Sequence, residues 1–426
     1  MSEKRFLTYT LWEITAGLFL LLNVTCLPSQ AKEIQYPVPS YEGTELKKVR
    51  QWEKTWAGKK IGPANIDGVK EFIPEALYQI IKDPEKWGES WFEIVPYRQI
   101  KPTSGDLAFT RKYAGTCTIG PDDKLHNYVS GIPFPNPKTG LEIAYNFDNL
   151  NQGDNTHALE DLWLIDGKKR YDRKMVLEAH FLYFSGRREI PPVPELSNPK
   201  GIYRATHVAH YEPASMRGTR AVLIKWKDRT KPYESYTFSS NTRKIVRRST
   251  AQRIASQGGS DAAGDDNLIY DNAISYMKYR YLGRKELLLA RDQDTDQLKE
   301  GHREGYCIVN GLQRERINTY VLECTHKNQG YIYSKQIWYI DPETWWILYT
   351  DKYDRNGKLW RVFDHASYVV KSAYNEALIP TIAFVLTIDV NRMHSTGGFS
   401  NYTLGKTGKY YQPEYYTPKA LQKYGY

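Results

Sequence analysis

The sequence offers few residues whose type and spacing suit catalysis. Asp265 and Asp266 are adjacent acids, and a glycoside hydrolase needs two carboxylates held at a fixed separation. The pair lies in residues 249–266, a Ser-, Gly- and Ala-rich insertion that is typical of a flexible, solvated loop or a lid. The chain has no Walker A, G-x-G-x-x-G, G-x-S-x-G or H-E-x-x-H motif. We therefore expect no catalytic residue, no cofactor and no enzymatic activity.

Cysteine and histidine give no pattern of a metal site. No C-x-x-C is present and the nine His are scattered, with His207 and His210 close in sequence, so we expect no metal. Cys307 and Cys324 flank a hairpin-sized segment, and a bridge between them would contribute about 3 kcal/mol in the chain-entropy model. We predict this disulfide, with two free buried thiols as the alternative.

The first 31 residues have the layout of a secretory signal peptide. Lys4 and Arg5 form a basic start, residues 14–22 form an apolar run, and small residues around Ala31 form a cleavage site. The apolar run is too short to span a bilayer comfortably. We predict cleavage after Ala31 and a mature chain in the periplasm, where it could also associate with the outer membrane. The alternative is a lipoprotein signal in which Cys26 is lipidated.

The composition describes a water-soluble, basic chain. Its 426 residues are 41% hydrophobic and 14% aromatic, which excludes a polytopic membrane protein and a disordered one. The net charge of +10 suits an anionic partner, and export removes nucleic acid from the favoured partners. Arg243, Arg247 and Arg248 form a basic patch in an alternating run. This patch is either a solvated sheet face or a site for anionic headgroups or a partner protein.

The elements that position these residues are predicted to be mostly strands. Residues 32–104 carry most of the helix signal and form an N-terminal helical or irregular region. From residue 105 to residue 426, strand-sized segments are separated by turn signals, without long helices between them. The predicted fold class is therefore mostly β (α+β), with one large curved antiparallel sheet or half-open barrel and helices packed on it.

One aromatic face of this sheet is predicted to form an apolar ligand trough. Residues alternate in direction along a strand, and we expect the charged Arg361 to face water, which turns its neighbours inward. The predicted ligand-binding residues are Trp338, Ile340, Trp345, Trp360 and Val362. The alternative is an ordinary core that helices cover completely.

Several segments resemble the bacterial DUF1329 family. They are residues 131–140, 243–248, 279–288, 337–345 and 416–421, and the resemblance spans roughly residues 60–426. It implies a fold similar to that of the outer-membrane lipoprotein-sorting carriers (LolA- and LolB-like), a half-open barrel closed by helices over an apolar cavity. It also implies service to Gram-negative envelope systems, and it carries over no catalytic residue.

Together these patterns predict a periplasmic binding or carrier protein for a lipid or other hydrophobic molecule. An inner-membrane transporter or an outer-membrane protein is its expected partner. Two other classes stay open: a periplasmic hydrolase of envelope polymers, and a structural protein that docks on a membrane transporter.

Overall fold

The computed structural model describes residues 36–424, except 257, 301–304 and 307–308, within one compact unit. The predicted signal peptide, its cleavage site and Cys26 lie outside the described residues. Within the described ranges, no helix is both long enough and apolar enough to cross a membrane.

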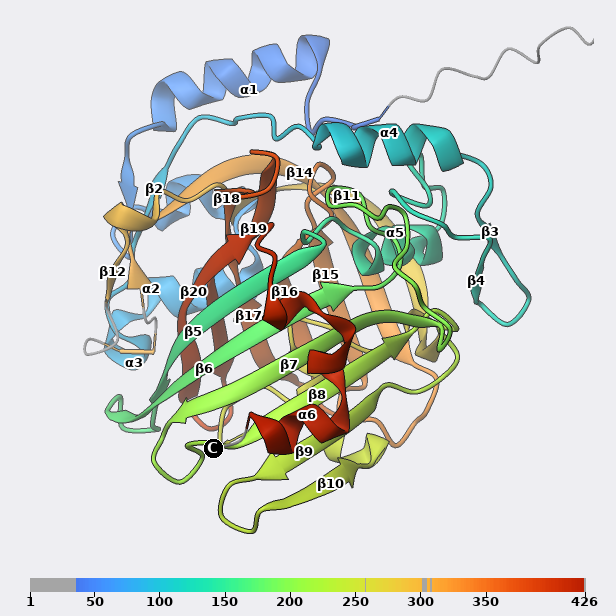
Figure 1. Ribbon diagram of the computed structural model, residues 1–426. Helices are drawn as coiled ribbons and strands as arrows, with labels where there is room; N and C mark the ends of the chain where they lie inside the picture. The colour runs from blue at the N-terminus through green and yellow to red at the C-terminus, as the bar shows by residue number, and fades with distance from the viewer. Residues whose placement is uncertain (1–35, 257, 301–304, 307–308, 425–426) are drawn as a thin grey trace, which may run out of the picture. The chain divides into compact units, whose positions relative to one another are not determined.

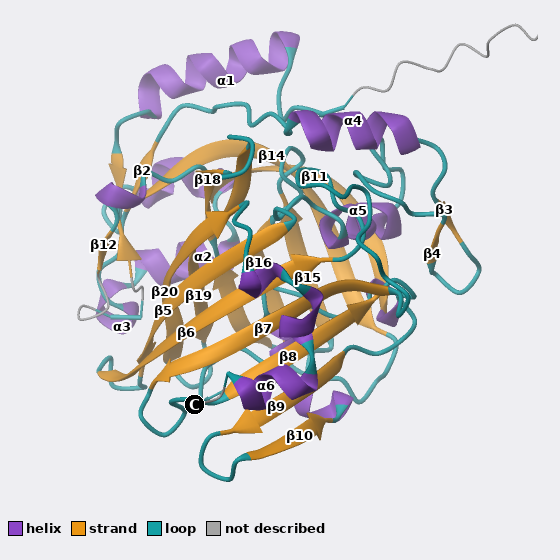
Figure 2. Cartoon of the chain, in the orientation of Figure 1, coloured by secondary structure: helices purple, strands orange, loops and turns teal. Residues whose placement is uncertain are grey.

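Most of the chain forms one large, curved sheet (Figures 1 and 2). Across the sheet, the first strands are β11 (Met277–Ala290), β14 (Leu312–His326), β15 (Lys335–Ile340), β16 (Ile347–Tyr353) and β17 (Leu359–Asp364). The order continues with β19 (Leu378–Asp389), β20 (His394–Leu404), β5 (Asn155–Ile165), β6 (Tyr171–Tyr183), β7 (Ile202–Glu212), β8 (Arg220–Trp226), β9 (Glu234–Ser239) and β10 (Lys244–Arg248). The predicted mostly β fold class is thereby confirmed.

The sheet is not closed into a barrel among the strands described. β10 pairs only with β9, and β11 pairs only with β14. β18 (Ala366–Lys371) pairs with β19. β2 (Phe92–Ile94) lies parallel to β14 and carries β1 (Lys60–Ile61) on its other side, so the sheet extends into the predicted N-terminal region. The pairs β3 (Thr118–Ile119) with β4 (Leu125–His126), and β12 (Lys299–Glu300) with β13 (Val309–Asn310), are separate two-stranded sheets.

Local turn chemistry explains the hairpins that the sequence predicts. Residues 354–357 join β16 to β17, and the Asp354 carboxylate accepts hydrogen bonds from the backbone N–H groups of Asn356 and Lys358. Gly357 closes the turn with a φ of +77°, a backbone conformation that glycine adopts without a Cβ clash. The Asp–Arg–Asn–Gly sequence therefore fixes this hairpin locally.

A long seam joins the two ends of the strand region. β20 pairs with β5 from Ser395 opposite Ile165 to Leu404 opposite Thr156. These partners come from opposite ends of the strand region, and their pairing makes one continuous sheet of the two halves (Figure 1).

The helices lie before, between and after the strands (Figure 2). They are α1 (Gly43–Trp56), α2 (Glu75–Lys82), α3 (Pro84–Trp87), α4 (Ser104–Tyr113), α5 (Gly140–Asp148) and α6 (Pro418–Lys423). Short 3₁₀ turns are η1 (Ile66–Phe72), η2 (Thr250–Ile254), η3 (Gly264–Asp266), η4 (Ile274–Tyr276), η5 (Thr295–Gln297), η6 (Lys409–Tyr411) and η7 (Pro413–Tyr416). A capping box between Thr139 and Glu142 fixes the start of α5.

Cross-strand register defines two faces of the sheet. One row runs Trp338, Thr350, Phe363, Thr387, Thr396 and Leu164 across β15, β16, β17, β19, β20 and β5. We call the face of this row the loop face, because residues 250–276 and α5 contact it. Over β6–β9, the opposite face is covered by the C-terminal segment of η6, η7 and α6, which is red in Figure 1, and we call it the tail face.

Candidate functional site

The predicted aromatic trough is a packed core. Trp338 is fully buried, and its ring contacts Phe147 of α5, Tyr270 of the loop and Tyr279 of β11. Trp345 is buried and stacks on Tyr320 with ring centroids 5.6 Å apart. Ile340 and Val362 are buried as well. The expectation that this face stays incompletely packed is therefore wrong at these four positions.

The orientation expected for β17 is also wrong. Val362 stands opposite Asp351, which stands opposite Ile337, so Val362 lies on the face opposite to Trp338. Trp360 stands at a bulge, where its Nε1 donates a hydrogen bond to Asp389. Arg361 instead lies on the loop face and is buried. Its guanidinium bonds the Tyr333 hydroxyl at 2.6 Å and lies 3.4 Å from Asp266. The buried Asp266 carboxylate therefore compensates the charge of Arg361, which was expected to face water.

The described residues of 250–276 form a packed plug, although the sequence predicts a solvated loop or lid for residues 249–266. Asp265 and Asp266 are buried, as are Arg253 and Asp261. Asp265 accepts a hydrogen bond from Arg253 Nε at 2.7 Å, and Asp266 accepts one from Lys352 Nζ at 2.6 Å. Each carboxylate is thus neutralised by a basic side chain, so the pair has the environment of a structural network and not of a hydrolase dyad.

The predicted Cys307–Cys324 disulfide is not supported. Cys307 lies outside the described residues, and Cys324 has a free, buried thiol in β14. In the hairpin-sized segment between the two cysteines, the residues from Leu312 onward belong to one long strand, β14, which also contains Cys324.

The predicted basic patch lies at the open edge of the sheet. All residues of β10 are exposed, and Arg247 lies 3.2 Å from Glu234 of β9. Arg247 also lines a groove of about 460 Å³ whose other walls are Lys200, Trp226, Lys231, Pro232 and Glu234. Arg243 precedes β10, and Arg248 donates a hydrogen bond to Thr237. Three basic side chains and one indole therefore line one shallow surface groove.

A half-buried apolar patch on the loop face was not predicted. Three successive cross-strand rows make it: Val385, Gly398, Leu162 and Met175; Ser400, Glu160, Leu177 and His210; and Tyr402, Ala158, Ala179 and Val208. Small residues lie within the first and third of these rows: Gly398, Ala158 and Ala179. The larger side chains around them stay half-buried, and we call this set the Glu160 patch: Glu160, Leu177, Val208, Val385 and Tyr402.

The Glu160 carboxyl is the chemically unusual group of this patch. Desolvation raises the pKa of Glu160 to about 7. No hydrogen bond or ion pair joins this carboxyl to any part of the chain that the structure describes. It lies between two small hydrophobic clusters, one around Ala179 and Phe181 and the other around Leu164 and Met175. An acid that is neutral near pH 7 in an apolar setting can donate a hydrogen bond to a polar group of a bound apolar molecule.

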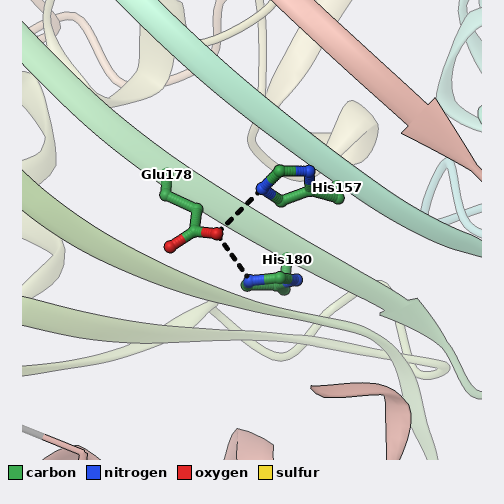
Figure 3. A group of neighbouring side chains, drawn as sticks. All are labelled: His157, Glu178 and His180. Carbon is green, nitrogen blue, oxygen red and sulfur yellow. Dashed lines mark hydrogen bonds and ion pairs between the residues drawn. The ribbon is translucent and has the colours of Figure 1, made fainter. Parts of the chain in front are cut away.

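A second group of side chains lies together on the tail face (Figure 3). His157 of β5, Glu178 of β6 and His180 of β6 converge, and their ligand atoms lie within 4.8 Å of one another. Glu178 Oε1 is 2.9 Å from His157 Nε2 and 3.3 Å from His180 Nε2. These hydrogen bonds lower the pKa of Glu178 far below its ordinary range. Among the residues described, this is the group whose atoms could hold a metal ion.

A family model described as "protein of unknown function (DUF1329)" matches residues 60–422. The chain belongs to the DUF1329 family. An uncharacterized protein of Pseudomonas aeruginosa is 22% identical over 278 residues, which are 61% of this chain. The match spans 58% of the length of that relative.

Solved structures also resemble this DUF1329 protein. An outer membrane lipoprotein-sorting protein domain from Vibrio parahaemolyticus is 14% identical with a TM-score of 0.47, covering 66% of this chain and 98% of its own. A DUF1329 family protein from Desulfovibrio piger is 15% identical with a TM-score of 0.47, covering 66% and 97%. A LolA superfamily protein from Nitrosomonas europaea has a TM-score of 0.36 at 14% identity, covering 66% and 100%.

Sequence reasoning missed both unusual groups of this DUF1329 protein for different reasons. Glu160 carried a usable signal, because it interrupts the stripe Ala158, Leu162 and Leu164 on one face of its own strand. His157 and His180 carried none, because they are far apart in sequence and only the β5–β6 register makes them neighbours.

Proposed function

We propose that this DUF1329 protein is an exported binding or carrier protein for a lipid or another hydrophobic molecule in the bacterial envelope. The observation that carries the proposal is the Glu160 patch, where apolar side chains remain half-buried beside a desolvated carboxyl. An acyl chain laid over this patch would gain about 0.8 kcal/mol for each buried CH₂ group. The neutral Glu160 carboxyl would then bond a polar group of the ligand.

The proposed route of the protein is export by a signal peptide over residues 1–31, release into the periplasm and association with the outer membrane or with a membrane transporter. The basic groove supports contact with anionic headgroups, because Arg247, Lys200 and Lys231 line it together with Trp226. Lys231 Nζ lies 5.5 Å from the centre of the Trp226 ring, a distance at which a cation and an aromatic ring attract each other. The predicted absence of enzymatic activity forms part of the proposal.

The deciding experiment compares two variants on β5 and β6. Leu177→Lys places a charge in the Glu160 patch, whereas Leu159→Lys places it on the tail face, where Leu159 is already 39% exposed. The probe is cis-parinaric acid, a fatty acid whose fluorescence rises in an apolar site. We expect Leu177→Lys to abolish the fluorescence rise and Leu159→Lys to retain it, with unchanged circular dichroism in both.

Native mass spectrometry of the protein after gentle purification supplies an independent measurement. Co-purified lipid that Leu177→Lys removes would support the proposal. A lipid-free wild-type mass together with no binding of the probe would overturn it. For the groove, co-sedimentation with vesicles containing phosphatidylglycerol is expected to fall in Arg247→Glu and to be unchanged in Lys371→Glu, a surface control on β18.

A further inference from the structure

Three histidines stand side by side across the tail face of the sheet. His157 of β5 is directly opposite His180 of β6, and His180 is directly opposite His207 of β7. Glu178 precedes His180 by two residues, so both side chains project from the same face of β6. Because these cross-strand rows are adjacent, the Glu178 carboxylate lies beside the imidazoles of His157 and His180 on one antiparallel pair of strands.

We propose that His157, Glu178 and His180 form a binding site for a divalent transition-metal ion. Imidazole nitrogens and a carboxylate oxygen are the donors that zinc takes in three-residue sites with one open position. The sequence predicted no metal site because it lacks Cys/His spacing patterns. A site of this kind has no such pattern, since its ligands come from two strands that are paired in space.

The separations of the three ligand atoms are near those of a metal shell. With bonds of about 2.0–2.2 Å, the donor atoms of a tetrahedral shell lie about 3.3–3.6 Å apart. The Glu178 oxygen lies 2.9 Å from His157 Nε2 and 3.3 Å from His180 Nε2. Both imidazoles thus present the same nitrogen type to one oxygen, and all three ligand atoms lie within 4.8 Å of one another, so small side-chain rotations would bring them into one shell.

The surroundings hold these three side chains in place. The Tyr211 hydroxyl donates a hydrogen bond of 2.6 Å to Glu178 Oε2, the oxygen that does not face the imidazoles. A hydrogen bond to the other carboxylate oxygen orients a carboxylate that ligates a metal. The His180 ring is stacked between His157 and Tyr410, at 4.8 Å from each. The three ligands are therefore fixed by their own strands, by Tyr211 and by the C-terminal segment.

The burial of His180 supports a role beyond an ion pair. Its side chain is 7% exposed, and its Nδ1 atom has no hydrogen-bond partner in the described part of the chain. His157 and Glu178 keep 22% and 26% of their side-chain surface, so solvent and ions reach the open side. A metal bond to Nε2 compensates the burial of this imidazole better than the single 3.3 Å contact with Glu178.

Zinc binding to the untagged, full-length mature protein tests the site. Isothermal titration is expected to show one saturable zinc ion per chain. His157→Ala and Glu178→Gln should each weaken the affinity by more than about 100-fold, because losing an outer-shell partner alone costs 10–100-fold. Tyr211→Phe, which removes only that outer bond, should weaken it by about 10-fold. His210→Ala, on β7 and directed to the loop face, should bind zinc as the wild type does.

Cobalt absorption spectroscopy and thermal denaturation with zinc give readouts that a structural ion pair would not produce. Co²⁺ bound by two imidazoles and a carboxylate is expected to show visible d–d absorption, which Glu178→Gln should abolish. Zinc should raise the melting temperature of the wild type and of His210→Ala but not of Glu178→Gln, since an ion that binds the folded state stabilises it. The proposal is overturned if zinc does not bind saturably, or if it binds His157→Ala and Glu178→Gln as tightly as the wild type.

Discussion

Lys352 and Asp266 form an ion pair in which neither side chain has any exposed surface. Lys352 Nζ lies 2.6 Å from Asp266 Oδ1 and also donates to the backbone oxygen of Ile269. Desolvation lowers the pKa of Lys352 despite this attraction. Asp266 comes from the plug and Lys352 from β16, so the pair fastens residues 250–276 to the loop face.

Breaking this ion pair is expected to destabilise the protein strongly. Lys352→Met leaves the Asp266 carboxylate buried with less compensation, which should lower the free energy of unfolding by about 3–5 kcal/mol. Urea denaturation measures the loss. The control is Lys371→Ala, which removes a pair with Glu376 whose side chains are 59% and 77% exposed and should cost at most about 1 kcal/mol. Equal losses in both variants would contradict the assignment of Asp266 to a buried network.

Glu160 is expected to make stability fall as the pH rises. Its pKa is about 7 in the folded chain but about 4.3 in an unfolded one, so between these values the folded state holds the extra proton. Unfolding then releases a proton, and the free energy of unfolding decreases from about pH 4.3 to pH 7. Glu160→Gln should remove this part of the slope in urea denaturation at pH 5 and pH 7.5, whereas the exposed Glu414→Gln should retain it. An unchanged slope in Glu160→Gln would show that the carboxyl is well solvated.

Two of the three tryptophans predicted for the trough, Trp338 and Trp360, should respond differently to truncation. Trp338→Ala removes a fully buried indole from contact with three rings and should cost about 3–5 kcal/mol of stability. Trp360 is half-buried and donates from Nε1 to Asp389, so Trp360→Ala should cost less. Neither change should affect binding of cis-parinaric acid at the Glu160 patch in protein that remains folded. If folded Trp360→Ala alone lost binding, the ligand site would lie at the predicted trough and not at the Glu160 patch.

Cys324 should be inert to thiol reagents while the protein is folded. Burial raises the pKa of its thiol far above the ordinary range, and the thiolate is the reactive form. We expect iodoacetamide to modify Cys324 only after denaturation, without prior reduction. Peptide mapping under non-reducing conditions identifies the labelled residue, and a Cys324 that requires reduction before labelling would contradict the free thiol.

The strands could be predicted from sequence because their signals are local. The turn at residues 354–357 and the alternation around it specify a hairpin without reference to the rest of the chain. Arg361 could not be oriented in this way, because its charge is compensated by Asp266, which lies 95 residues earlier. The His157–His180 contact likewise depends on the register between β5 and β6.

The seam between β20 and β5 sets the order in which this chain can complete its structure. Thr156 pairs with Leu404, a residue roughly 250 positions later in the sequence. Contacts between residues so far apart in sequence make folding slow. Until the last strands have been synthesised, β5 lacks its neighbour on one side and the sheet remains in two halves. A growing chain therefore cannot complete this sheet on the ribosome, and the proposed export would meet it before it has folded.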